Sequence, residues 1–348
     1  MPRRRDASPL CPRDEKVAVR FERRGPLCSS EPPIPRRTGA HDAQPSSTPP
    51  FPITMNRHTR PLVALTTLAL SPFVEAHGQS QPQPIEVPWN DALPPGTPAH
   101  VERALAESSR HGEYVDIKLA DGTPLNAWVV YPERGDKAGV VLVVHDIRGL
   151  SNWARAVADQ LAQDGFIAVA PDFLSGKGPN GGGTASLGDQ VGQTIRALTA
   201  DEVVGRLNAA RDYGLALPAA NGKAAVLGFC WGGTQSFRYA TAQPDLDASV
   251  VFYGDVPGAS ATAVPEDQLA AIQAPVLGLY GGNDARINST LPPTIAAMMK
   301  LKKTYEYHTF EGAGHGFSSR QDGANGANLS ATQHAWPLVL TFLRRHLE

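Results

Sequence analysis

Hydrophobic and polar positions follow two alternating patterns from residue 113 onward. Short, nearly continuous apolar runs are typical of strands that are buried on both faces of a parallel sheet. Such strands are expected at residues 139–145, 166–171, 223–229, 248–254, 275–281 and 304–310. Stretches with helical spacing lie between or after them, at 152–165, 200–217, 233–242, 292–301 and 334–347, with Pro337 near the first turn of the last. This alternation predicts an α/β fold, with a mostly parallel central sheet and helices on both faces.

A hairpin is expected before the first parallel strand. The segments 113–119 and 125–131 both alternate in polarity, and the turn-forming stretch "ADGTP" joins them, which predicts an antiparallel pair. In open parallel sheets ligands collect at the carboxyl ends of the strands. The loops 174–200 and 254–273 follow such ends, so we expect them to cover the site and to select the substrate.

The first 76 residues do not have the pattern of a folded domain. Residues 1–54 are rich in Arg, Pro and Ser without apolar periodicity. Residues 55–76 combine a basic start, the apolar run "PLVALTTLAL" and small residues ending at Ala76, which is typical of a secretory signal peptide. We therefore interpret residues 1–54 as a misassigned or disordered extension. The alternative is a basic N-terminal region that precedes a single anchor helix.

Removal of residues 1–76 would change the charge and composition of the chain that folds. Residues 77–112 form a polar, Pro-rich approach, and 113–348 are expected to form one domain. Of the 32 Lys and Arg residues 20 lie in 77–348, together with 27 of the 34 Asp and Glu residues, which leaves a formal net charge of −7. An acidic domain lacks the electrostatic footprint of a nucleic-acid binder. The expected location is periplasmic or secreted, with no membrane attachment after signal cleavage.

One cysteine follows a predicted strand, between glycines. Cys230 in "GFCWGG" has Gly228 two positions before it and Gly232 two after it, which is the G-x-S-x-G elbow pattern with sulfur in place of the hydroxyl. Cys11 and Cys28 lie in the leader, so Cys230 is the only thiol of the exported chain. The pattern predicts a nucleophile at a helix N-terminus, with the Trp231 amide aimed at an oxyanion. The alternative is a small buried hydrophobic residue.

A thiol nucleophile needs a base, and the base needs a partner that orients it. Asp284 in "GGNDARI" and His315 in "GAGHGF" each follow a predicted strand. The chain order of nucleophile, acid and histidine is that of α/β-hydrolases. Taken singly, Asp284 could be a turn residue and His315 a loop histidine bonded to backbone. No metal-ligand cluster, phosphate loop or dinucleotide fingerprint occurs, so no metal or cofactor is expected.

Together, "GFCWGG", "GGNDARI" and "GAGHGF" resemble the dienelactone hydrolase (carboxymethylenebutenolidase-like) family of the α/β-hydrolase fold. The resemblance also includes residues 143–178 and covers roughly 113–347. It implies Cys230 as nucleophile, His315 as base and Asp284 as its partner. It further implies that Asp146, at a position where many members carry Glu, switches the thiol between a resting and an activated state. The amide of Ile147 would be the second oxyanion donor.

Four further side chains are candidates for substrate contact. Arg148 suits a substrate carboxylate, although an ion pair with a surface acid is an equal interpretation. Arg320 lies near the predicted site, and Phe173 and Phe317 could line an apolar pocket, unless they are core residues. We expect a hydrolase, monomeric or homodimeric, that opens lactones or cleaves small esters. A non-catalytic binding protein and a thiol redox protein are the alternatives; the complete triad disfavours the first, and the lack of a resolving cysteine the second.

Overall fold

The computed structural model describes residues 84–348. Its centre is an eight-stranded sheet with the order β1-β2-β4-β3-β5-β6-β7-β8. The strands are β1 (Gly112–Lys118), β2 (Pro124–Val130), β3 (Ala138–Val144), β4 (Ile167–Pro171), β5 (Ala220–Phe229), β6 (Ala248–Phe252), β7 (Val276–Gly281) and β8 (Tyr305–Phe310). β1 and β2 pair antiparallel, β2 joins β4 antiparallel, and the pairs from β4 to β8 are parallel. The predicted α/β class and the initial hairpin are confirmed.

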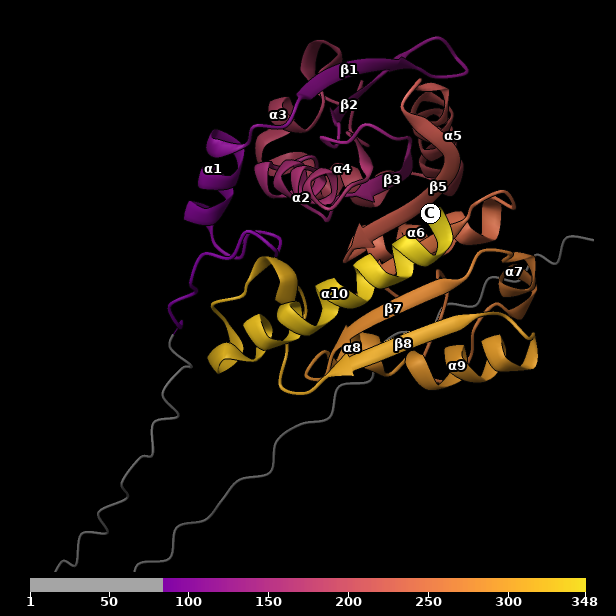
Figure 1. The fold of residues 1–348 in the computed structure, drawn as a ribbon. Helices are drawn as coiled ribbons and strands as arrows, with labels where there is room; N and C mark the ends of the chain where they lie inside the picture. Colours follow the sequence, from indigo (N-terminus) through magenta and orange to yellow (C-terminus); the bar gives the residue numbers. More distant parts are fainter. Residues whose placement is uncertain (1–83) are drawn as a thin grey trace, which may run out of the picture. The chain divides into compact units, whose positions relative to one another are not determined.

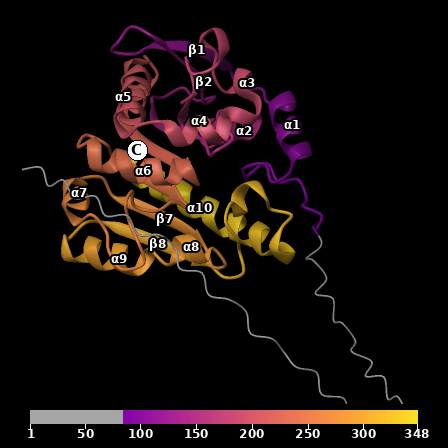
Figure 2. The same ribbon diagram turned by 180° about the vertical axis from the view of Figure 1, so that it is seen from behind.

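Helices cover both faces of this sheet (Figure 1). The helices are α1 (Pro98–Glu107), α2 (Asn152–Gln163), α3 (Thr184–Leu187), α4 (Val191–Ala197), α5 (Ala200–Ala216), α6 (Trp231–Ala242), α7 (Glu266–Ala271), α8 (Ala285–Asn288), α9 (Leu291–Lys300) and α10 (Ala327–Leu347). Buried residues of α2 and α10 pack on one face, and those of α5, α6 and α9 on the other. Figure 2 shows the ribbon from behind. Crossover helices on both faces are what parallel strands require.

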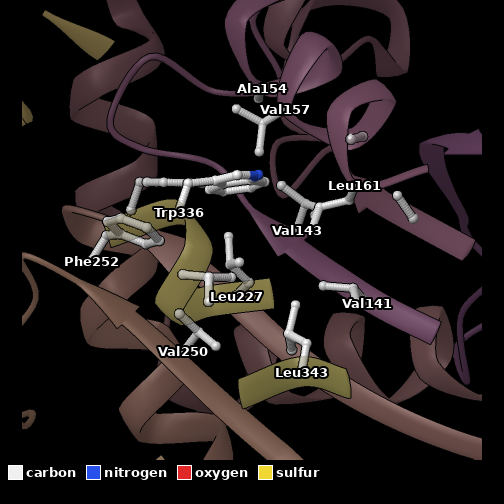
Figure 3. Close-up of a cluster of buried hydrophobic side chains, with 14 of the residues drawn as sticks. Val141, Val143, Ala154, Val157, Leu161, Leu227, Val250, Phe252, Trp336 and Leu343 are labelled. Carbon is white, nitrogen blue, oxygen red and sulfur yellow. The ribbon is translucent and has the colours of Figure 1, made fainter. Parts of the chain in front are cut away.

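The strand residues divide strictly between two cores. Val141 and Val143 of β3 point into the core beneath α2 and α10, together with Leu227 and Val250 of neighbouring strands (Figure 3). Val140 and its alternate neighbours point into the opposite core. All are fully buried, and each such side chain contributes about 1.5–3 kcal/mol relative to exposure. The continuous apolar runs therefore reflect burial on both faces.

The last helix is longer than expected. α10 begins at Ala327, so Pro337 lies inside the helix and the prediction that it stands near the first turn is wrong. The early turns bury Asn328 and Thr332 on the same side as Trp336. Because two of these buried positions are polar, the apolar pattern starts too late to reveal the true beginning of the helix.

The approach segment is also more ordered than its composition suggests. It contains α1, whose first turn is capped by the Thr97 side chain, which accepts a hydrogen bond from the His100 amide at 3.2 Å. Trp153 Nε1 of α2 donates to the carbonyl oxygen of Pro95 at 2.9 Å. Residues 84–107 are therefore fastened beside α2 as part of the domain.

The predicted extension at 1–54 and the predicted signal peptide at 55–76 lie outside the described residues. Within 84–348, no helix combines the length and the apolar character needed to cross a membrane. The same residues contain no group of three or more His, Cys, Asp or Glu side chains placed to hold a metal ion.

Candidate active site

A sharp turn between β5 and α6 carries Cys230. Its backbone has φ 58° and ψ −115°, a conformation that L-residues rarely adopt. The two flanking glycines are required by contact with neighbouring backbone. A Cβ on Gly228 would lie 2.1 Å from the carbonyl oxygen of Gly232, and one on Gly232 would lie 2.2 Å from that of Val144. The "GFCWGG" stretch therefore folds into the predicted elbow and places the thiol at the start of α6.

Two further loops bring polar side chains to this thiol. His315 follows β8, and its Nε2 atom lies 3.0 Å from Cys230 Sγ. Asp284 follows β7, and its Oδ2 atom lies 2.5 Å from His315 Nδ1. The second oxygen of Asp284 accepts the amide of Ile287 at 3.4 Å, which fixes the carboxylate at the start of α8. The structure thus brings together all three predicted triad residues, in one hydrogen-bonded chain.

The two partners of His315 favour the protonated form of its ring. The hydrogen bond to Asp284, followed by that to Cys230, raises the pKa of His315 to about 9. Burial acts to raise the pKa of Asp284, but the hydrogen bond and charge of His315, together with the Ile287 amide and the charge of Arg286, outweigh this effect and lower the pKa. These contacts favour an imidazolium between the carboxylate and the sulfur once Nε2 has accepted a proton, and both ring nitrogens then donate.

The predicted oxyanion donors lie where two loops meet the elbow. Trp231 is the first residue of α6, so its amide belongs to the turn that a helix leaves without internal acceptors. Ile147 lies in the loop after β3, and its amide donates no hydrogen bond to any residue of 84–348. Close packing of Gly232 on the backbone of Val144 and His145 brings these two segments together.

A fully buried histidine supports this region. His145 stacks on the Trp231 ring at 5.7 Å between centroids, and its Nε2 accepts the Phe173 amide at 3.3 Å. Burial lowers the pKa of His145, which keeps the ring neutral. The covering segment 174–200 contributes Leu174, Leu187 and Ile195, which cluster against Trp231.

Two predicted substrate contacts are core residues instead. Phe173 and Phe317 are both fully buried. Phe173 packs edge-on against Trp231 at 5.5 Å, and Phe317 packs edge-on against Tyr253 at 5.3 Å. They support the floor of the site and present no surface to a ligand, which corrects the expectation from sequence.

Asp146 and Arg148 form an ion pair beside the elbow. Arg148 Nη2 lies 2.5 Å from Asp146 Oδ2, and Nε lies 2.9 Å from the same oxygen. The Arg148 amide also donates to Asp146 Oδ1 at 2.8 Å. Arg148 therefore forms the ion pair that was one of its two interpretations. No hydrogen bond joins Asp146 to Cys230, so the expected contact between Asp146 and the thiol is not formed in this structure. Arg320, the other predicted arginine, is exposed and forms no ion pair within residues 84–348.

The family profile "Dienelactone hydrolase family" matches residues 125–347. The chain belongs to the dienelactone hydrolase family. It is a hydrolase of lactones or esters, as the curated relatives of this family indicate.

Several curated relatives cover most of the dienelactone hydrolase domain. A "Putative carboxymethylenebutenolidase" of Saccharolobus solfataricus is 29% identical over 259 residues, which cover 65% of this chain and 96% of the relative. A protein of the same description from Methylorubrum extorquens is 30% identical and covers 67% and 80%. A "Probable 2-oxo-3-(5-oxofuran-2-ylidene)propanoate lactonase" of Bradyrhizobium sp is 30% identical and covers 68% and 94%.

Solved structures agree on the fold. A putative dienelactone hydrolase from Klebsiella pneumoniae subsp. pneumoniae superposes with a TM-score of 0.59 at 24% identity, over 68% of this chain and 99% of the other. The dienelactone hydrolase-like phosphotriesterase P91 from metagenomic libraries gives 0.56 at 23% identity, over 69% and 100%. At these identities the likeness supports the dienelactone hydrolase fold alone.

Tyr253 is another aromatic residue that the sequence allows either as a pocket lining or as a core residue, and the structure buries it beside the triad. Its φ of 40° is unusual for a residue with a side chain, and it is 2% exposed directly after β6. The ring lies edge-on to His315 at 5.1 Å between centroids. An aromatic residue at the end of a central strand, between the nucleophile and the histidine in chain order, was the available signal. In this dienelactone hydrolase, Tyr253 packs beside the imidazole and limits its movement.

Proposed function

We propose that this dienelactone hydrolase uses Cys230 as its nucleophile and forms a thioester with the acyl part of the substrate. The observation that carries the proposal is the 3.0 Å separation of Cys230 Sγ and His315 Nε2 at a strained elbow. Transfer of the thiol proton to Nε2 gives a thiolate and an imidazolium, and Asp284 stabilises the latter through Nδ1.

Attack by sulfur on the ester carbonyl forms the C–S bond and moves the carbonyl electron pair onto oxygen. The amides of Trp231 and Ile147 donate to that oxyanion. Collapse restores the carbonyl, breaks the C–O bond, and passes the His315 proton to the leaving alkoxide. In a lactone this new hydroxyl stays attached to the acyl chain. His315 then takes a proton from water, the hydroxide attacks the thioester, and the carboxylate product leaves as the thiol is restored.

We also propose that the substrate carries a carboxylate in addition to the ester. The name of the Bradyrhizobium relative describes a propanoate that bears an oxofuran lactone ring. Arg148 supports a similar preference here, because its side chain is 49% exposed and its Nη1 atom has no hydrogen-bond partner among residues 84–348. Arg320 is a second exposed cation on the loop that follows His315. Asp146 would act on the thiol only after it releases Arg148.

The full-length protein and its Cys230→Ala variant test the mechanism side by side on cis- and trans-dienelactone and on a short p-nitrophenyl ester. We expect turnover of all substrates to disappear in the variant while the far-UV circular dichroism stays unchanged. Full activity in Cys230→Ala would reject the nucleophile. A lactone-to-ester ratio of kcat/KM near one would reject the carboxylate preference alone.

Export to the periplasm or the medium is a further proposal, which rests on the signal-like residues 55–76. It predicts a mature chain that starts at residue 77, monomeric or homodimeric. N-terminal sequencing of the protein recovered outside the cytoplasm checks this, and a mature chain that begins before Met55 would contradict it.

A further inference from the structure

A cavity of about 260 Å³ lies between α1 and the segments that follow β3 and β8. Complete small-molecule sites measure about 300–1,000 Å³, so this cavity has room for one end of a substrate. It is lined by Thr97, Pro98, Val101 and Glu102 at the start of α1, by Arg148, Ser151, Asn152 and Trp153 after β3, and by Ser319 after β8. We call it the α1 cavity.

The inner walls of the α1 cavity contact the residues next to the catalytic groups. Trp153 packs edge-on against Phe229, the residue before the nucleophile, at 4.7 Å between ring centroids. Ser319 Oγ donates to the carbonyl oxygen of Gly316, the residue after the triad histidine, at 3.3 Å. Arg148 comes directly after the second predicted oxyanion donor. The cavity therefore lies beside the triad, although no triad residue lines it.

The outer wall, α1, is fixed to the loop that carries the histidine. Gln321 is 2% exposed, and its Nε2 atom donates to the carbonyl oxygens of Pro94 at 2.8 Å and of Ser318 at 3.1 Å. Val101 of α1 is buried in the same core as Trp153. α1 also precedes the part of the chain that the family profile matches. It is therefore an ordered wall of the site that membership of the family does not predict.

Two charged side chains line the α1 cavity, Arg148 on the inner wall and Glu102 on α1. Glu102 is exposed, and its carboxylate forms no ion pair or hydrogen bond within the described part of the chain. The adjacent Arg103 does not neutralise it, because Arg103 pairs with Glu107 at 2.9 Å and lies over the Trp89 ring at 4.5 Å. The α1 wall therefore presents an uncompensated negative charge.

We propose that Glu102 sets the charge selectivity of the substrate site, which accepts an ester with one carboxylate and disfavours a second carboxylate near α1. This role rests on the proposed function, in which Arg148 holds the first carboxylate. A second carboxylate in the α1 cavity meets Glu102, and the cation of the cavity is already occupied. The repulsion between two such charges acts through partly exposed surroundings, so it is moderate and salt screens it.

The test measures binding to the full-length Cys230→Ala protein, so that affinity is read without turnover. Two esters share one carbon chain: monomethyl glutarate has one free carboxylate, and the terminal monomethyl ester of tricarballylic acid has two. Isothermal calorimetry gives the ratio of their dissociation constants. We expect the second carboxylate to weaken binding, and Glu102→Gln to reduce this weakening by about two- to fivefold, the range for exposed charge pairs. At about 1 M salt the effect of Glu102→Gln should disappear.

Glu86→Gln is the matched control in the same background. Glu86 is an exposed carboxylate that also precedes α1, but it does not line the α1 cavity. Its replacement should leave the ratio of the two dissociation constants unchanged. Glu102→Lys extends the series in the other direction, because it replaces repulsion of the second carboxylate by attraction. It should reduce the ratio below that of Glu102→Gln.

Amide NMR of the Cys230→Ala protein locates the bound ester. Monomethyl glutarate should shift the amides of residues 99–102 and 319 together with those of the elbow. Shifts confined to the elbow, absence of saturable binding, or a ratio that Glu102→Gln leaves unchanged or that Glu86→Gln changes equally would each overturn the role of Glu102. Failure of the catalytic proposal is seen separately, as ester turnover that persists in Cys230→Ala, and it does not enter the binding ratio.

Discussion

His315 Nδ1 lies 2.5 Å from Asp284 Oδ2, and the carboxylate of that pair is almost completely buried. This contact fixes the ring so that Nε2 faces the Cys230 sulfur, and it is the main reason why the pKa of His315 rises to about 9. Orientation and charge of the imidazole therefore depend on one buried oxygen.

Asp284→Asn tests that dependence. The amide keeps the shape of the side chain but loses the charge and permits the wrong tautomer, so we expect kcat to fall by about 10³-fold or more, by comparison with serine hydrolase triads. NMR titration of His315 should show its pKa lowered toward the ordinary value. A variant with normal kcat would contradict the assigned role of Asp284.

The same pair makes stability depend on pH. The folded pKa of His315 lies above its ordinary value of 6.5. Its stabilising contribution is therefore fully present below about pH 6.5 and is lost as the pH rises through 9. Because a third of the side chain is exposed, we discount the contribution to about 1–2 kcal/mol. Chemical denaturation of the wild type and of His315→Gln between pH 6 and 10 measures it. A stability difference that does not change with pH would contradict the pairing.

The glycines of the elbow give a prediction about stability. A Cβ on Gly232 would lie 2.2 Å from backbone oxygen, which cannot move cheaply. Gly232→Ala should destabilise the fold by about 3 kcal/mol or more and abolish activity. Gly205→Ala is the matched control, because nothing lies within 4 Å of that position in α5. It should be neutral or stabilising by about 0.5–1 kcal/mol, as measured by urea denaturation. Equal effects of the two variants would refute the packing argument.

Arg148→Gln separates two roles of that arginine. If Arg148 holds a substrate carboxylate, KM for dienelactone should rise by about 10- to 100-fold, the equivalent of a hydrogen bond to a charged group. KM for a p-nitrophenyl ester without a carboxylate should change little. A purely structural ion pair with Asp146 would instead produce the same change for both substrates.

Much of the geometry of this site could be predicted from the sequence because each candidate triad residue follows a strand of the parallel sheet. Cys230, Asp284 and His315 stand after β5, β7 and β8, and parallel strands bring their carboxyl ends to one edge. The short glycine-containing motifs around these residues then determine the turns. Chain order and local pattern were therefore enough for the triad and for the sheet.

Features that depend on contacts with residues distant in sequence were harder to predict. Thr97 and Pro98 are a recognisable helix start, but the Pro-rich surroundings concealed α1, which depends on packing against α2. Phe173 and Phe317 have the composition of a pocket lining, and only the tertiary structure shows that they lie beneath it. The Arg148–Asp146 contact is local in sequence, yet two interpretations of Arg148 were equally compatible with the loop.

Mass spectrometry of the protein during turnover tests the central claim most directly. His315→Gln should slow hydrolysis of the thioester more than its formation from an activated p-nitrophenyl ester. Rapid acid quench and peptide mapping should then find the acyl group on Cys230, sensitive to neutral hydroxylamine. An acyl group on another residue, or turnover by the wild-type protein with no acyl-enzyme under conditions that trap the thioester of a control cysteine hydrolase, would contradict the account.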